Sequence, residues 1–132
     1  MSRLLLDTTF LIDADRAGDD LDELIADDDD VAIAAITVAE LLVGVELSEG
    51  RNRTRRQAFV DDIAVTVPVL SYDLDVAAAH AELLVAVRRQ GLPRGAHDLI
   101  IAATAKASNR TVVTADTTAF DDLPDVPVRS HR

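Results

Sequence analysis

Short apolar runs alternate along the chain with longer stretches in which apolar residues recur at helical spacing. The short runs predict four buried strands and a shorter fifth one, at residues 3–7, 31–36, 64–70, 110–116 and 125–129. The longer stretches predict helices at residues 8–17, 19–30, 37–48, 51–63, 72–90 and 97–108. Apolar strands that alternate with helices are typical of a parallel sheet covered on both sides. The pattern therefore predicts one α/β domain over residues 1–132, with three α/β/α layers around a parallel sheet of four to five short strands.

The last predicted helix is apolar on nearly every face, yet it begins with two polar residues. His97 and Asp98 precede Leu99, Ile100 and Ile101, and alanines follow. A helix that is apolar all round belongs in the interior of a protein. A carboxylate carried to the interior costs free energy unless it has a partner. We therefore expect Asp98 to have a partner at the beginning of this helix.

Three further acids stand where the chain leaves a predicted strand or enters a predicted helix. Asp7 ends the first strand, and Asp116 follows the fourth. Glu40 lies in the first turn of the helix that follows the second strand. Sites in open parallel sheets form beyond the carboxyl ends of the strands. We therefore expect these three acids to converge with Asp98 at one edge of the sheet.

Each acid also has a purely structural interpretation. Asp7 is a candidate helix N-cap, and Asp116 suits an Asx turn. Glu40 stands three residues after Thr37, which is the spacing of a capping box, and Asp98 complements a helix dipole. These interpretations stay open for each residue alone. A purely structural role for all four acids at once is less favoured, because all four interrupt apolar stretches and are therefore expected at the edge of the core.

Carboxylates that converge are tolerated when they are protonated or when a cation occupies the site. Two carboxylates about 5 Å apart repel by roughly 3 kcal/mol at an effective dielectric constant of 20. Oxygen ligands without His or Cys select Mg²⁺, with Mn²⁺ as the alternative. A carboxylate-bound Mg²⁺ activates water and neutralises developing charge in phosphodiester chemistry. The four acids therefore predict a metal-dependent site for cleaving a phosphodiester.

Composition limits the other functional classes. The chain holds 24 acidic and 13 basic residues, a formal charge of −11, which taken alone argues against a nucleic-acid-binding surface. Cysteine is absent, which excludes disulfides and thiolate chemistry. The N-terminal apolar run of Leu4, Leu5 and Leu6 is too short for a secretion signal or a membrane span. We therefore expect a cytoplasmic protein without membrane association.

Four stretches, in order, resemble the motifs of PIN-domain ribonucleases. They read LLLDTTFLID, ITVAELLVG, LPRGAHDLIIAATA and VVTADTTAF, and each contains one of the four acids. Their order and spacing agree over nearly the whole chain, which is most similar to the VapC-type toxins of toxin–antitoxin pairs. The resemblance implies a PIN-like fold and a Mg²⁺-dependent endoribonuclease that acts on RNA. It also implies a homodimer that is neutralised by a small VapB-like antitoxin.

The same resemblance implies roles for individual residues. All four acids match catalytic positions, and the positions of direct metal ligands are matched by Asp7, Asp98 and Asp116. Thr114 matches a hydroxyl that helps to order the site, and Thr9 stands where Asn or Ser is common, so neither is expected to bind metal directly. Many relatives carry Asn in place of Asp116, which leaves its role as a direct ligand open.

A basic cluster and one histidine are further candidates. The arginines Arg51, Arg53, Arg55 and Arg56 either contact RNA phosphates or balance nearby acids on a solvated helix. His97 is a candidate general base beside Asp98. A polar residue in the first turn of a helix is the simpler interpretation of His97, because a metal-bound water needs no histidine.

The alternative to an enzyme is an interaction module, a PIN fold that binds a partner and does not cut. The presence of all four acids favours the enzyme. Two other classes of phosphoryl-transfer α/β protein are each excluded by a single residue of this sequence. A haloacid-dehalogenase pattern needs an acid two residues after Asp7, where Thr9 stands. A response-regulator receiver needs a lysine at the end of a late strand, whereas Lys106 falls within a predicted helix.

Overall fold

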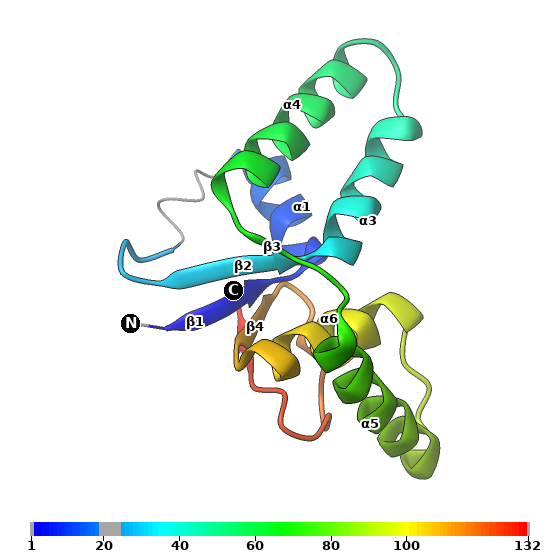
Figure 1. Cartoon of the computed structure of the whole chain (residues 1–132). Helices are drawn as coiled ribbons and strands as arrows, with labels where there is room; N and C mark the ends of the chain where they lie inside the picture. Colours follow the sequence, from blue (N-terminus) through cyan, green and yellow to red (C-terminus); the bar gives the residue numbers. More distant parts are fainter. Residues whose placement is uncertain (1, 19–24, 132) are drawn as a thin grey trace.

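A sheet of five parallel strands forms the centre of the molecule. The structure, a computed structural model, describes residues 2–18 and 25–131. The strands stand in the order β3-β2-β1-β4-β5 (Figure 1). Their bounds are β1 Arg3–Leu6, β2 Asp30–Ala34, β3 Val69–Leu70, β4 Thr111–Thr114 and β5 Val128–Ser130. The predicted α/β class with a parallel sheet of short strands is confirmed.

Helices cover both faces of this sheet. One face carries α1 Thr8–Ala17, α3 Ala35–Glu46 and α4 Gly50–Thr66, and the other carries α5 Leu74–Gln90 and α6 Ala96–Ser108 (Figure 1). A short 3-10 helix, η1 Thr117–Ala119, follows β4. Alternate residues of β1 serve the two faces, because Leu4 and Leu6 pack in one apolar cluster and Leu5 in the other. The three-layer prediction is confirmed.

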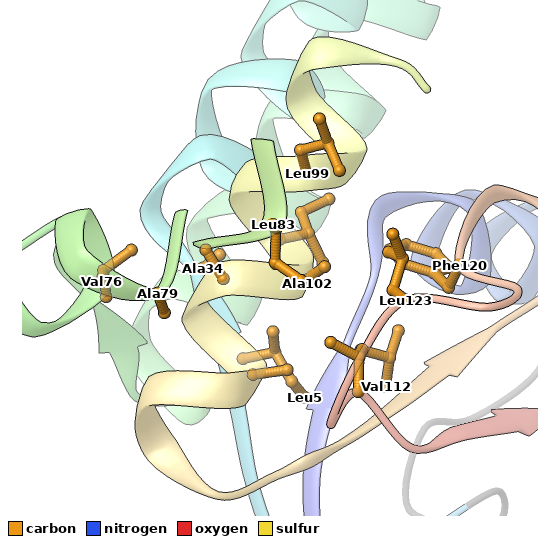
Figure 2. Close-up of a cluster of buried hydrophobic side chains, with 14 of the residues drawn as sticks. Leu5, Ala34, Val76, Ala79, Leu83, Leu99, Ala102, Val112, Phe120 and Leu123 are labelled. Atoms are coloured by element: carbon orange, nitrogen blue, oxygen red, sulfur yellow. The ribbon is translucent and has the colours of Figure 1, made fainter. Parts of the chain in front are cut away.

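Helix α6 lies in the interior, as its sequence predicts. Leu99 and Ile101 are almost fully buried, and Ala102, Ala103 and Ala105 are completely so. Figure 2 shows Leu83 of α5 beside Ala102, where the small alanine side chain leaves room for the neighbouring helix. Because burial begins at Leu99, directly after Asp98, this helix carries a carboxylate to the rim of the core.

The predicted strand at residues 64–70 is wrong over most of its length. Helix α4 continues to Thr66, and only Val69 and Leu70 form a strand. The β-branched residues in this stretch suggested a strand, but Ile63 is buried and Val65 is 86% exposed, as on an amphipathic helix. Pro68 then prevents further helix, since the residue before a proline is pushed out of helical geometry.

Two helix boundaries also differ from the prediction. Helix α3 begins at Ala35 directly after β2, with Ala34 as an N-cap that has no side-chain hydrogen bond. The capping-box interpretation of Thr37 is therefore wrong, because this residue lies inside the helix and is fully buried.

Part of the helix predicted at 19–30, including its residues 21 and 24, lies outside the described residues. From Ile25 the chain forms a turn that leads into β2.

No helix in the described part of the chain combines the length and the apolar character that crossing a membrane requires.

Candidate active site

All four predicted acids lie at the carboxyl-terminal edge of the sheet. Asp7 follows β1 and Asp116 comes shortly after β4, and these two strands are neighbours. Glu40 lies in α3, which continues directly from β2, and Asp98 lies in the first turn of α6. The chain passes from β1 to β2 on one side, whereas β4 flanks β1 on the other. Ligands of parallel α/β proteins bind at such a reversal of strand order.

Asp7 is buried and is held by three groups. The backbone N–H of Phe10 donates to Asp7 Oδ1 at 2.9 Å, which makes Asp7 the N-cap of α1. The Thr114 hydroxyl donates to Oδ2 at 2.6 Å, and the Thr9 hydroxyl lies 2.9 Å and 3.0 Å from the two carboxylate oxygens. The capping interpretation of Asp7 is thus confirmed, and these hydrogen bonds hold its side chain in a single orientation at the edge of the sheet.

Thr114 connects two of the acids. Its side chain is completely buried, and besides bonding to Asp7 it accepts a hydrogen bond from the backbone N–H of Asp116 at 3.0 Å. The Thr9 hydroxyl lies 3.1 Å from it and also accepts from the backbone N–H of Ala115. These hydroxyls therefore connect the end of β1 to the turn that carries Asp116. The role of Thr114 in ordering a metal site stays a prediction.

Glu40 is held by residues that the sequence did not single out for this purpose. The Thr8 hydroxyl donates to Glu40 Oε1 at 2.7 Å and lies 3.2 Å from the buried Thr37 hydroxyl. On the other side, His97 Nδ1 lies 3.4 Å from Glu40 Oε2. Two features of the sequence accompany these contacts: Thr8 stands between Asp7 and Thr9, and Thr37 is a polar residue on an otherwise apolar helix. Neither feature specified its partner, which lies in another element.

Asp98 is half-buried and leans back over the beginning of its helix. Gly95 is the N-cap of α6, and a Cβ atom added there would lie 2.7 Å from Asp98 Oδ2. Real Cβ atoms do not approach other heavy atoms so closely, so the glycine leaves the space that the carboxylate occupies. The helix dipole also favours a negative charge at this end.

Asp116 is the most peripheral of the four acids, and its side chain is exposed. It caps η1, accepting from the Thr118 backbone N–H at 3.2 Å and from the Thr118 hydroxyl at 2.6 Å. The Asx-turn interpretation is thus satisfied here. The residue nevertheless belongs electrostatically to the site, because its charge acts on Asp98.

The pKa values of the two most enclosed acids are raised. For Asp98 the largest cause is burial, followed by the negative charges of Glu40, Asp7 and Asp116, while His97 acts in the opposite direction. Burial is also the largest cause for Asp7, where the hydrogen bonds from Thr114, Phe10 and Thr9 hold the pKa down. The charges of Glu40, Asp7 and Asp116 therefore all act on Asp98, and a cation bound there would relieve this repulsion.

The donor set fits a hard divalent cation. It consists of carboxylate oxygens, which Mg²⁺ and Mn²⁺ prefer as ligands. In residues 2–18 and 25–131, no three Asp, Glu or His side chains are grouped as they would be around an ion. Glu40 and Asp116 are instead turned toward Thr8 and Thr118, respectively. The fit consequently rests on donor chemistry and on mutual repulsion among the acids.

The predicted basic cluster lies on α4 and is largely engaged within the chain. Arg53 pairs with Glu46 at 3.2 Å, and Arg55 Nη1 lies 2.9 Å from Asp15 Oδ1. The Arg56 guanidinium donates to the Gly44 carbonyl at 3.1 Å. Arg51 is exposed near the beginning of the helix. These contacts favour charge balance on a solvated face, and the RNA-binding role of the four arginines stays a prediction.

Replacing Gly95 by alanine tests whether the space that this glycine leaves for the Asp98 carboxylate is needed for activity. The new methyl group displaces the Asp98 carboxylate, and we expect RNA cleavage to fall about tenfold or more, since misplacement of a reacting group by about 1 Å costs up to a hundredfold. Gly44→Ala is the matched control, because its Cβ would meet only Arg56 Nη1 at 3.7 Å. That control is expected to cleave normally and to gain about 1 kcal/mol in its free energy of unfolding. Equal cleavage by both variants would contradict this role of Gly95.

Comparison with known proteins identifies the family. The model of the PIN-domain family matches residues 4–126. The chain therefore belongs to the PIN-domain family. Within this family it is of the VapC type, because its relatives include VapC ribonucleases and its structural neighbours include VapBC complexes.

Its similarity to proteins of known sequence and structure is extensive. "Ribonuclease VapC" of Rickettsia bellii is 27% identical over 126 residues, which are 95% of this chain and 93% of that protein. "Toxin FitB" of Neisseria gonorrhoeae is 36% identical over 104 residues, 76% of this chain and 73% of that protein. The structure of VapBC2 from Rickettsia felis, bound to a promoter DNA fragment, superposes with a TM-score of 0.87 at 26% identity and covers 97% of this chain and 98% of that one.

Proposed function

We propose that this protein is a Mg²⁺-dependent endoribonuclease and the toxin of a type II toxin–antitoxin system, formed by a single PIN domain over residues 1–132. The observation that carries the proposal is the gathering of the four acids at the carboxyl edge of the sheet, where the charges of the other three act on the half-buried Asp98. The names of the relatives, which include ribonucleases and endonucleases, support the same reaction. The reaction takes place in the cytoplasm, where RNA is available.

In this proposal Asp7, Asp98 and Asp116 hold Mg²⁺, or Mn²⁺ in its place. The bound cation lowers the pKa of water and neutralises charge at the phosphate. The protein contributes a fixed arrangement of acids. Hydrogen bonds from Thr114, Thr9 and the Phe10 N–H keep Asp7 in one orientation. Glu40, held by Thr8, keeps a proton acceptor beside the reacting centre.

The cation also resolves a conflict in the composition. A chain with a formal charge of −11 repels RNA, whose backbone is negative. A divalent ion held by Asp7, Asp98 and Asp116 would cancel part of that charge where the phosphate must approach. RNA binding in this proposal therefore depends on metal, and basic residues such as those of α4 supply at most a secondary contact.

The proposed partner is a VapB-like antitoxin. Structures of VapBC complexes resemble this chain over nearly its full length, which supports such a partner. A cleft of about 200 Å³ between α1, α3 and α4 is lined by Ile12, Leu41 and Phe59 and reaches Glu40. An apolar antitoxin segment suits the apolar lining of this cleft. An arginine on that segment would reach Glu40 only past the three arginines that also line the cleft, where its guanidinium could pair with the carboxylate in a fork. We also propose that the toxin is a homodimer.

The second candidate function is that of a PIN fold that binds a partner without cutting RNA. The two functions differ in what they demand of Asp7. A binding module needs Asp7 only as the cap of α1, whereas a nuclease needs its charge.

Expression of the chain alone in bacteria distinguishes the two functions. We expect growth arrest with degraded RNA from the unaltered chain. We expect neither effect from Asp7→Ala, produced at the same level and verified as folded by circular dichroism. Asp73→Ala removes a comparable N-cap, that of α5, and is expected to leave toxicity intact. Intact RNA in cells arrested by the unaltered chain would contradict the nuclease.

A further inference from the structure

The loop that follows η1 is tied by two side chains to the hairpin between α5 and α6. Gln90, the last residue of α5, donates from Nε2 to the Asp122 carbonyl at 2.9 Å. Arg94, in the connection to α6, donates from Nη2 to the Asp121 carbonyl at 2.5 Å. Two neighbouring carbonyls of one loop are thus held by two donors that lie close together in sequence.

This loop has a conformation that needs outside support. Asp122 and Asp125 have φ values of 61° and 58°, in the left-handed region, which aspartate adopts more readily than most residues other than glycine but still at a cost. Such strain persists when the surrounding structure determines the backbone from several sides. Phe120 and Leu123 fix the loop from within, as they are buried against the core (Figure 2). Gln90 and Arg94 fix it from outside.

These two hydrogen bonds, from Gln90 and Arg94, are called the tie below. Each of the two segments that the tie joins lies next to an acid of the candidate site. Arg94 precedes Gly95, the N-cap over which Asp98 lies. On the other side, Asp121 follows Phe120, the C-cap of η1, and the N-cap of η1 is Asp116. The tie therefore joins the segment before Asp98 to the segment after Asp116. These are two acids whose charges act on one another, although they lie on separate elements.

Arg94 is turned toward the protein rather than toward an incoming anion. Its Nε atom is buried, and it has no hydrogen-bond acceptor among the described residues. Arg89, one residue before Gln90, is by contrast an exposed arginine in the last turn of α5. An arginine that serves RNA phosphates needs its N–H groups at the surface, so the geometry of Arg94 suits a structural tie.

We propose that Arg94 and Gln90 are positioning residues that set the separation of Asp98 and Asp116, an inference that rests on the proposed nuclease function. Neither side chain touches the reacting atoms. They act by holding the loop of residues 121–125 against the beginning of α6. Release of the tie lets the two carboxylates move apart and weakens the site they share.

The test compares Arg94→Met and Gln90→Met with Arg89→Met, in the full chain with RNA as substrate. We expect kcat to fall about tenfold in the first two variants, with KM changed less than about twofold, because misplaced groups act on the chemical step. We expect Arg89→Met to retain normal kcat. Arg94→Lys, which keeps one donor for the Asp121 carbonyl, is expected to recover most of the lost kcat.

Gln90→Met separates positioning from charge, because it removes a tie without removing a positive charge. A rise in KM in both arginine variants, with Gln90→Met unchanged, would overturn the proposal in favour of electrostatic RNA binding. Normal kinetics in Arg94→Met and Gln90→Met would overturn it as well.

Two further readouts do not depend on cleavage. Titration with Mn²⁺, followed by electron paramagnetic resonance, is expected to give a several-fold higher Kd for Arg94→Met and Gln90→Met and an unchanged Kd for Arg89→Met. Amide hydrogen exchange of residues 117–123 is expected to accelerate in the same two variants. Unchanged exchange in both would overturn the tie. If the unaltered chain does not cleave RNA, the proposed function fails, while exchange and Mn²⁺ binding still decide whether the tie exists.

Discussion

Replacing Asp98 by asparagine is expected to lower RNA cleavage about a thousandfold and to leave the metal-free protein folded and more stable. The loss of activity follows because the carboxylate is a proposed metal ligand, and metal assistance contributes several kcal/mol to such reactions. The gain in stability follows because Asp98 is destabilised by burial and by the charges of Glu40, Asp7 and Asp116.

The pH dependence of this gain has a defined sign. The folded pKa of Asp98 lies above its ordinary value of 3.8, so the folded state holds the proton more tightly than the unfolded state. The carboxylate therefore begins to cost stability above about pH 3.8, and the cost grows as pH rises through the raised folded pKa. We expect Asp98→Asn to exceed the unaltered chain in melting temperature at about pH 7 and to lose that advantage toward about pH 4.

Asp75→Asn is the matched control, since Asp75 is an exposed acid in the first turn of α5. It is expected to change neither cleavage nor the pH dependence of melting. An Asp98→Asn variant that is both unfolded and inactive would instead support a structural role for the carboxylate, and a folded variant that cleaves normally would contradict its role as a metal ligand.

Replacing Thr114 by valine is expected to lower cleavage about a hundredfold, although valine has nearly the same shape. The change removes the donor to Asp7 Oδ2 and the acceptor of the Asp116 N–H. Leaving buried polar groups without partners costs about 1–3 kcal/mol of stability. It also releases the two acids that Thr114 connects, and a misplacement of about 1 Å costs up to a hundredfold in rate.

Thr104→Val separates the effect on activity from the effect on stability. Thr104 is also buried, but its hydroxyl donates to the Ile100 carbonyl within α6. We expect a small loss of stability and normal cleavage from this variant. Because the Thr114 hydroxyl lowers the pKa of Asp7, we also expect the acidic limb of the cleavage profile to move to higher pH in Thr114→Val. Equal cleavage by the two valine variants would rule out a role for Thr114 in the site.

The acids could be predicted from sequence because each one interrupts an apolar run at a strand end or helix start. That position follows from local pattern and from the common direction of parallel strands, so Asp7 and Asp116 converge once β1 and β4 are neighbours. The burial of α6 followed in the same way from its apolar faces. The local sequence pattern was sufficient to predict an element wherever the burial of its apolar residues alone determines its type and position.

Partners across the fold could not be predicted in this way. Thr8 meets Glu40 over 32 residues of sequence, and Arg94 meets the Asp121 carbonyl over 27. Such contacts depend on how the layers stack, which periodicity does not specify. The strand predicted at 64–70 failed for a related reason. β-branched residues suit both a strand and a solvated helix face, and packing of Ile63 against the core determined the outcome.

An acidic, cation-dependent site that cleaves RNA is the central claim for this chain, and a metal titration tests it most directly. Purified chain is stripped of metal and incubated with RNA in excess EDTA, then with increasing Mg²⁺ or Mn²⁺, alongside Asp98→Asn purified identically to reveal any contaminating nuclease. We expect no cleavage in EDTA, saturable recovery with either ion, and no recovery in the variant. Undiminished cleavage by the unaltered chain in excess EDTA would contradict a metal-dependent site.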